Sequence, residues 1–156
     1  MSRARSTNPI PPAAGGLGAR LFAPVDIASL VFFRIGLGAI LVWEVVRYFD
    51  HGWIGRYWIR PAFHFTYYGF EWVRPWPGIG MYLHFAALGL LAVGIALGWH
   101  YRLCAALFAL GFIYVFLLEQ AVYLNHFYML CLLGILLPFL PLHHAWSLDA
   151  ARNRRL

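Results

Sequence analysis

The sequence contains no lysine, and charged residues of any kind occupy only 12% of its 156 positions. A soluble domain of this length carries roughly twice that share of charge. Hydrophobic residues make up 62% of the chain, which leaves too little polar surface to keep a folded water-soluble protein dissolved. We therefore expect an integral membrane protein, with the lipid bilayer as its main partner.

The basic residues are all arginines, and they give a net charge of +6. They are scattered singly or gathered at the termini, without the basic stripe or binding module that nucleic acid requires. Arginines that flank apolar helices are more typical of contacts with cytoplasmic lipid headgroups. The sequence thus predicts no nucleic-acid partner.

Patterns for metal and nucleophilic chemistry are also missing. The two cysteines, Cys104 and Cys131, lie inside apolar runs, where a cysteine is usually a small buried hydrophobe. The seven histidines show no HExxH or similar spacing, so no metal site is expected. The sequence has no Ser-His-Asp order, phosphate loop or dinucleotide fingerprint.

Long apolar runs are the most prominent positive feature. A helix needs about 20 residues to cross the hydrocarbon core. The first run meets this length only by including Arg34 and Glu44, and the third is short. The sequence predicts an all-α bundle of about four transmembrane helices, over residues 27–49, 81–98, 103–118 and 121–142.

The third and fourth runs must be separated by a break. A continuous helix over 103–142 would be about 60 Å long, twice the thickness of the bilayer core. We expect a tight hairpin near residues 119–125, which would bring Glu119, Gln120, Asn125 and His126 to one membrane face.

The remaining segments differ in composition from these runs. Residues 1–21 are rich in Pro, Gly, Ala and Ser and predict a disordered tail, after which Asp26 is a plausible helix N-cap. Residues 22–150 form the predicted membrane domain, and 151–156 a basic C-terminal tail. Residues 50–80 interleave aromatic rings with arginine and histidine, which suits an interfacial or re-entrant connector between the first two helices.

The distribution of arginines predicts the orientation of the chain. With four crossings, seven arginines fall on the side of the termini and four on the other side. The positive-inside rule then places both termini in the cytoplasm. The first group is Arg3, Arg5, Arg20, Arg102, Arg152, Arg154 and Arg155; the second is Arg47, Arg56, Arg60 and Arg74.

Two ionisable side chains lie inside the first predicted helix. A charge at membrane depth costs about 2.5–3.5 kcal/mol or more, so it is normally paired or functional. Glu44 can pair with Arg47 at i, i+3. Arg34 lies about 15 Å from Glu44 along the axis and lacks a partner in its own helix. Its counter-ion must come from elsewhere, and Glu119 or an anionic ligand are the candidates.

A second polar group surrounds the expected hairpin. Glu119, Tyr123 and His126 fall at i, i+4 and i+7 and would line one stripe if the segment were helical. Asn125 lies one residue off that stripe, and Gln120 is adjacent. A carboxylate, a phenol and an imidazole together can move protons or hold a polar ligand. The alternative is a set of interfacial residues that cap a hairpin.

Several ordered motifs resemble a known family. Its bacterial members, the HTTM (horizontally transferred transmembrane) proteins, carry close versions of residues 61–70 and 123–128. The membrane domain of vitamin K-dependent γ-glutamyl carboxylase is similar at residues 26–34, 98–102, 114–119, 125–128 and 146–149. The resemblance covers about residues 22–150 and implies a membrane-helix fold and a site for a reduced quinone of the vitamin K type.

One position departs from the carboxylase pattern. The carboxylase has a lysine that deprotonates the hydroquinone directly after the acidic residue of its YVFLLD motif, and Gln120 holds that place here. An amide cannot act as a general base. We therefore expect no glutamate carboxylation by this chain. Arg34, Glu119, Asn125 and His126 are predicted to form a polar cluster that fixes helix packing and faces a quinone-like or other amphipathic ligand.

Two alternatives stay open at this point. In one, the chain is a membrane oxidoreductase or carboxylase in which Glu119 or His126 supplies the base. In the other, it is an N-terminal fragment that needs a second membrane chain, because the carboxylase continues beyond the region of resemblance. A second copy of the chain, in a homo-oligomer, is the other candidate partner.

Overall fold

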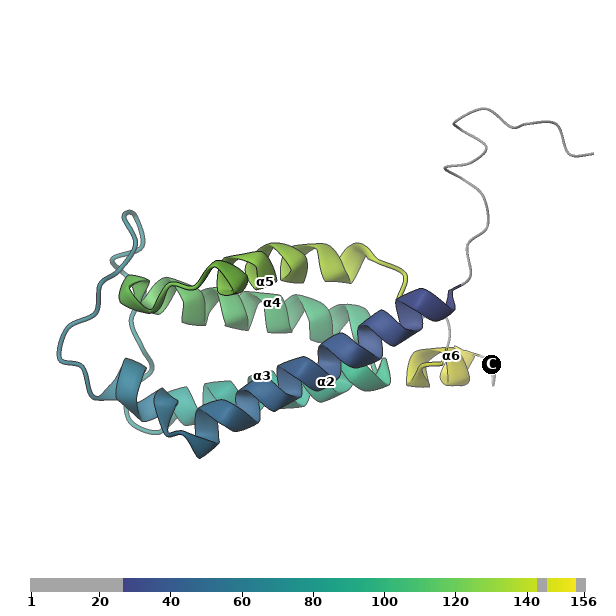
Figure 1. The fold of residues 1–156 in the computed structure, drawn as a ribbon, viewed down its shortest axis with the longest axis horizontal. Coiled ribbons are helices and arrows are strands. Elements are labelled where there is room, and N and C mark those ends of the chain that lie inside the picture. The colour runs from purple at the N-terminus through teal and green to yellow at the C-terminus, as the bar shows by residue number, and fades with distance from the viewer. Residues whose placement is uncertain (1–26, 143–145, 154–156) are drawn as a thin grey trace, which may run out of the picture.

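The computed structural model describes residues 27–142 and 146–153 (Figure 1). The predicted tail over 1–21, the proposed N-cap Asp26 and residues 154–156 of the basic tail lie outside the described residues. Every regular element of the described residues is a helix, as the long apolar runs predict.

Three helices in the described part of the chain are long and apolar enough to cross a membrane: α2 (Ala28–Asp50), α3 (Gly80–Leu97) and α4 (Tyr101–Leu118). They match the first three predicted runs to within a few residues. The shorter elements are η1 (Gly55–Ile59), η2 (Gln120–Val122), α5 (Asn125–Leu136), η3 (Leu137–Phe139) and α6 (Leu148–Asn153). The predicted all-α membrane bundle is confirmed.

The fourth predicted crossing is shorter than expected. The run over 121–142 gives one apolar helical stretch, Asn125–Phe139, formed by α5 and η3. At its start Tyr123 and Leu124 are extended, and near its end Pro138 lies in η3, after which Leu140 is extended. Proline has no backbone N–H, so it cannot continue the α-helical hydrogen-bond ladder. The predicted break near 119–125 is present.

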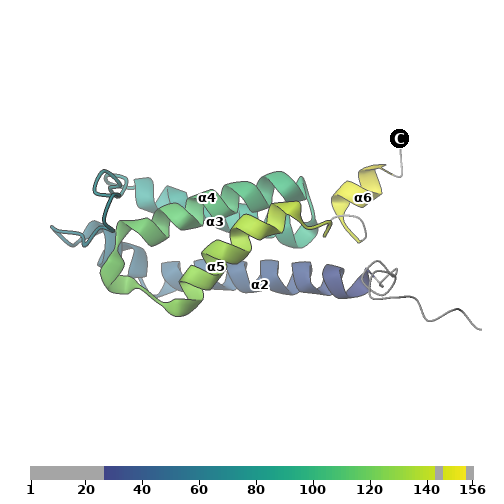
Figure 2. The same cartoon turned by 90° about the horizontal axis from the view of Figure 1, so that it is seen from above.

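The helices run roughly along the long axis and alternate in direction (Figures 1 and 2). Each helix packs on the next in sequence, α2 on α3, α3 on α4 and α4 on α5. This order gives the bundle two ends. The connector end holds residues 51–79 and the α4–α5 link, and the opposite end holds the α3–α4 turn, the start of α2 and α6 (Figure 1).

Two features of the packing suit a helix bundle in lipid: helix backbones approach each other closely, and apolar side chains cover the outer faces. A Cβ added at Gly38 of α2 would lie 2.7 Å from the backbone of Ala96 in α3, so this contact requires glycine. On the outer faces, Phe32, Trp43 and Leu90 are exposed by 65–74%. Lipid, unlike water, does not drive such side chains inward, and small residues at the contacts allow tight van der Waals packing.

Candidate functional site

Arg34 and Glu119 lie at opposite ends of the bundle, so the expected pairing between them is wrong. Arg34 is completely buried and donates hydrogen bonds from Nη1 to the carbonyl oxygen of Leu142 (2.9 Å) and from Nη2 to that of Trp146 (2.5 Å). Alternating helix direction explains the result, because it brings the start of α2 beside the C-terminal segment and the end of α4 beside the connector.

Asp149 lies at the same end as Arg34 and interacts with it electrostatically. Its two carboxylate oxygens accept the backbone N–H groups of His100 (3.0 Å) and Tyr101 (2.9 Å), which cap the start of α4. Burial disfavours the charged carboxylate, but these two bonds and the positive charge of Arg152 outweigh burial and lower the pKa of Asp149. Arg34 and Asp149 therefore hold α2, α4 and the C-terminal segment together.

Glu119 is the centre of a separate cluster at the connector end. It leaves the helical conformation at the end of α4, and its side chain is 7% exposed. Oε2 lies 3.1 Å from Nδ1 of His64, while Oε1 accepts the backbone N–H groups of Phe65 (3.2 Å) and Ala121 (3.1 Å). The N–H of Gln120 donates to the carbonyl oxygen of Phe65 (2.7 Å). These bonds attach the connector to the end of α4.

The other residues predicted around the hairpin do not form the expected stripe, because residues 119–124 are not one helix. The ring of Tyr123 packs edge-on against Phe116 at 5.8 Å between ring centroids. Gln120, Asn125 and His126 are exposed, and the described ring contact of His126 is with Phe127, at 4.7 Å. Of the predicted cluster, only Glu119 is buried at this end.

Glu44 pairs with Arg47, as the i, i+3 spacing predicts. The distance from Glu44 Oε1 to Arg47 Nη1 is 2.7 Å, and both side chains are about one-third exposed, at 35% and 37%. The Arg47 guanidinium also lies 5.2 Å from the ring centroid of Trp53. Glu44 is therefore part of a partly exposed structural pair and lies apart from both buried clusters.

Residues of the connector line an open cavity of about 770 Å³. This is within the usual size range of small-molecule sites. Four polar residues contribute to it, His64, Thr66, Glu71 and Arg74. The rest of the lining is apolar or small: Trp58, Ile59, Pro61, Ala62, Phe63, Val73, Pro75, Trp76, Pro77 and Gly78.

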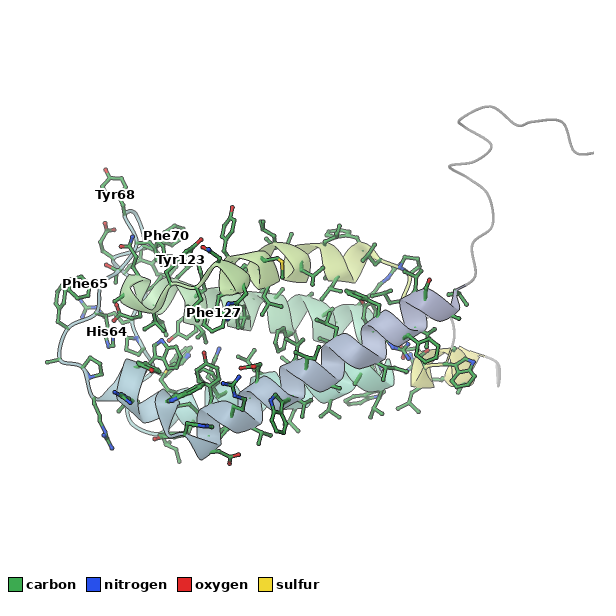
Figure 3. All side chains as sticks on the ribbon, viewed as in Figure 1. His64, Phe65, Tyr68, Phe70, Tyr123 and Phe127 are labelled. Carbon is green, nitrogen blue, oxygen red and sulfur yellow. The ribbon has the colours of Figure 1, made fainter. Side chains whose placement is uncertain are left out.

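Two of these lining residues differ clearly in their setting. His64 lines the cavity and is mostly buried, with 15% of its side chain exposed, and it lies at the connector end of the bundle (Figure 3). Glu71 is exposed and accepts the backbone N–H of Gly69 at 3.0 Å, and this bond lowers the pKa of Glu71. An imidazole held by a buried carboxylate, next to an aromatic cavity, can bind or exchange a proton with a polar group.

The sequence interpretation placed His64 in an interfacial connector and did not assign it a partner. One feature of the sequence could have pointed to His64 as a functional residue: it lies inside the motif over residues 61–70 that resembles the family. The pairing with Glu119 spans 55 residues of sequence, so no helical spacing reveals it.

Comparison with known proteins gives one match and one negative result. A family model described as the HTTM domain matches residues 22–156. No solved structure matches the chain. The matched region includes the connector cavity and both buried clusters.

Proposed function

The chain belongs to the HTTM domain family, and on this premise we propose that it is a multi-pass membrane protein that binds a quinone-like, amphipathic ligand in the connector cavity. The observation that carries the proposal is the cavity itself, which combines aromatic walls with His64, whose imidazole is held from behind by the buried Glu119.

The composition of the lining supports this ligand class. Trp58, Phe63 and Trp76 offer flat apolar surfaces against which an aromatic ring can stack. Arg74 offers hydrogen-bond donors for quinone oxygens, and His64, whose Nδ1–H faces Glu119, offers Nε2 as an acceptor for a ligand hydroxyl. A mostly apolar pocket with few polar groups is the usual form of a small-molecule site.

The residues in the proposal differ from those expected from the sequence. His64 and Arg74 replace His126 and Arg34 as the polar contacts of the ligand, and Glu119 orients His64. Glutamate carboxylation is not part of the proposal, because the chain has no lysine and Gln120 occupies the position of the carboxylase base.

Titration with menadione tests the proposal on the full chain in detergent. Quinones quench nearby tryptophans, and Trp58 and Trp76 line the cavity; equilibrium dialysis gives an independent dissociation constant. We expect saturable binding that His64→Ala weakens about threefold to tenfold, because the imidazole ring is part of the cavity wall against which the menadione ring packs.

His51→Ala is the matched control, because His51 is an exposed histidine of the same connector whose Nδ1 contacts the carbonyl oxygen of Arg47 outside the cavity lining. It should bind menadione as the wild type does. Unsaturable partitioning, or equal affinity of the His64→Ala variant, would contradict the proposed site.

A second candidate is a membrane oxidoreductase or carboxylase acting on a reduced quinone, and the His64–Glu119 pair favours it. Glu119 and His126, the two bases predicted from the sequence, are less suited to accept a proton from the ligand. Glu119 already accepts three hydrogen bonds, and His126 is exposed beside Phe127. Incubation of folded protein with reduced vitamin K and oxygen tests this candidate: epoxide formation supports it, and folded protein that forms none argues against it.

We also propose that both termini face the cytoplasm of a bacterial inner membrane. A separate proposal is that the chain assembles with a second membrane chain or with a second copy of itself. The start of α2 and α6 lie at the same end of the bundle, which supports a common side (Figure 1). Reporter fusions at each terminus test the topology, and light scattering of the purified protein measures its oligomeric state.

A further inference from the structure

Residues 65–72 of the connector carry a group of exposed aromatic side chains, and we call this segment the aromatic tip. The four side chains are those of Phe65, Tyr68, Phe70 and Trp72. Tyr68 and Trp72 are the most exposed of the four, at 99% and 76%. Gly69 allows the chain to turn between them, because its φ of 84° lies in the left-handed region that favours glycine. Apolar groups gathered on a surface in this way normally mark a contact with lipid or with a partner.

Hydrogen bonds fix the aromatic tip to the bundle on both sides. At its start, the backbone N–H of Phe65 donates to Oε1 of Glu119 (3.2 Å), and the carbonyl oxygen of Phe65 accepts the N–H of Gln120 (2.7 Å). Beyond its end, the hydroxyl of Tyr114 in α4 donates to the carbonyl oxygen of Arg74 at 2.7 Å. The aromatic rings are therefore held outward by an anchored loop.

The root of the aromatic tip lies on α4 and α5. The ring of Tyr67 stacks on Phe116 of α4 at 5.3 Å between centroids, and Phe116 also contacts Tyr128 of α5 at 6.4 Å. From this root the tip projects sideways from the long axis of the bundle, with Tyr68 at its outer point (Figures 1 and 3). The helices that can cross a membrane run along that axis. The tip therefore extends parallel to the membrane plane, at the connector end.

The helical stretch beside the tip is too short to cross the hydrocarbon core. α5 has 12 residues and η3 has 3, and together they rise only about 24 Å, against about 30 Å for the core. A short segment is accommodated by thinning of the bilayer and by polar flanking residues that meet the headgroups. Gln120, Asn125 and His126 are exposed at the connector end of this stretch. Headgroups beside α5 can therefore reach the level of the tip.

We propose that the aromatic tip is an interfacial anchor, and that its partner is the phospholipid headgroup layer of the protein's own bilayer. Composition alone favoured membrane contact for the whole of residues 50–80, whereas this proposal assigns it to one anchored loop. Tyrosine and tryptophan suit the layer because each has an apolar ring and a polar group. By resting on the lipid beside α5, the tip sets the depth of the connector end, with or without a ligand in the cavity.

Exposed arginines at the same end support a lipid partner. Arg56 and Arg60 form no ion pair with an acidic side chain in the part of the chain that the structure describes. Lipid phosphates at the level of the helix ends would supply their counter-ions. Asp50 and Glu71 are also exposed at this end, so the attraction is to individual phosphates and does not require a lipid with net negative charge. Phosphatidylcholine is therefore a sufficient lipid for the test.

The test places a fluorescent NBD label on Tyr68→Cys in the full chain, reconstituted in phosphatidylcholine vesicles. The wild type is the labelling blank, because Cys104 and Cys131 are buried. Lipids that carry a doxyl quencher near the headgroup should quench this label more strongly than lipids that carry it deep in the acyl chain. A label on Leu132→Cys, at an exposed position within α5, should show the reverse order.

Asp50→Cys is the matched control, because Asp50 is exposed at the same end and lies outside the aromatic tip. Aqueous iodide should quench the label at Tyr68 about threefold less than the label at Asp50, since the interfacial layer limits its access. Tyr68 is almost fully exposed, so its replacement should not disturb the fold. If Tyr68→Cys nevertheless fails to fold, Trp72→Cys replaces it with the same expected results.

Three outcomes would overturn the proposal. Equal iodide quenching of the labels at Tyr68 and Asp50 would place the tip in water. Stronger quenching by the deep doxyl group would place the tip among the acyl chains, as a re-entrant segment. Protection from iodide without quenching by either lipid would show that a protein surface, from a second copy or another chain, covers the tip.

Discussion

Replacement of Arg34 by methionine should strongly destabilise the bundle. Methionine keeps a long apolar side chain of similar reach but removes the guanidinium. The carbonyl oxygens of Leu142 and Trp146 then lose the donors that lie 2.9 and 2.5 Å away. Hydrogen bonds from a charged donor contribute about 1.5–3 kcal/mol each. Removal of the buried charge offsets part of this loss, so we expect the free energy of unfolding to decrease by about 2–4 kcal/mol.

The chain contains its own reporter for this experiment. Cys104 and Cys131 are free thiols and only 6% and 7% exposed, so a thiol-reactive dye labels them when the bundle opens on heating. A loss of about 2–4 kcal/mol corresponds to a midpoint lowered by about 5–10 °C for a domain of this size. Arg102→Met is the control, because Arg102 is an exposed arginine near the same end.

The refuting result is specific. If Arg34→Met unfolds at the wild-type temperature while remaining monodisperse, the buried guanidinium does not hold the C-terminal segment to α2. If Arg102→Met lowered the unfolding midpoint by the same amount, loss of any arginine would destabilise the protein in detergent. The two hydrogen bonds of Arg34 would then not be the cause.

Two further predictions concern stability. The lowered pKa of Asp149, whose ordinary value is 3.8, implies a stabilising contribution that is complete above the ordinary pKa and is lost as the pH falls through the lower folded value. Asp149→Asn should therefore lower the unfolding midpoint at pH 7 and match the wild type in strong acid; a difference that is independent of pH would contradict this. Gly38→Ala should cost about 1–3 kcal/mol, since the new Cβ meets the backbone of Ala96 at 2.7 Å. Gly36→Ala, on the same helix with nothing within 4 Å, should change the stability by less than about 0.5 kcal/mol, and equal thermal midpoints for the two variants would refute the close contact.

The candidate site was only partly predictable from the sequence. Glu119 was identified because a carboxylate between two apolar runs is costly near a membrane and is normally paired or functional. Its partner His64 was missed, since the connector has no period from which a contact can be inferred. The predicted stripe of Glu119, Tyr123 and His126 was wrong because it assumed helical spacing across a segment that the backbone breaks twice, at Glu119 and at Tyr123–Leu124.

The sequence by itself determined that this is a helical membrane protein, because the free energy of moving apolar runs into lipid depends on composition and length. It also determined the first three helices, a break near residues 119–125 and the pairing of Glu44 with Arg47, all of which are local. Only the tertiary structure decided that Arg34 binds the C-terminal segment and that Glu119 binds His64. A buried charge fixes the need for a partner, but the direction and packing of the helices decide which distant group comes within hydrogen-bonding distance.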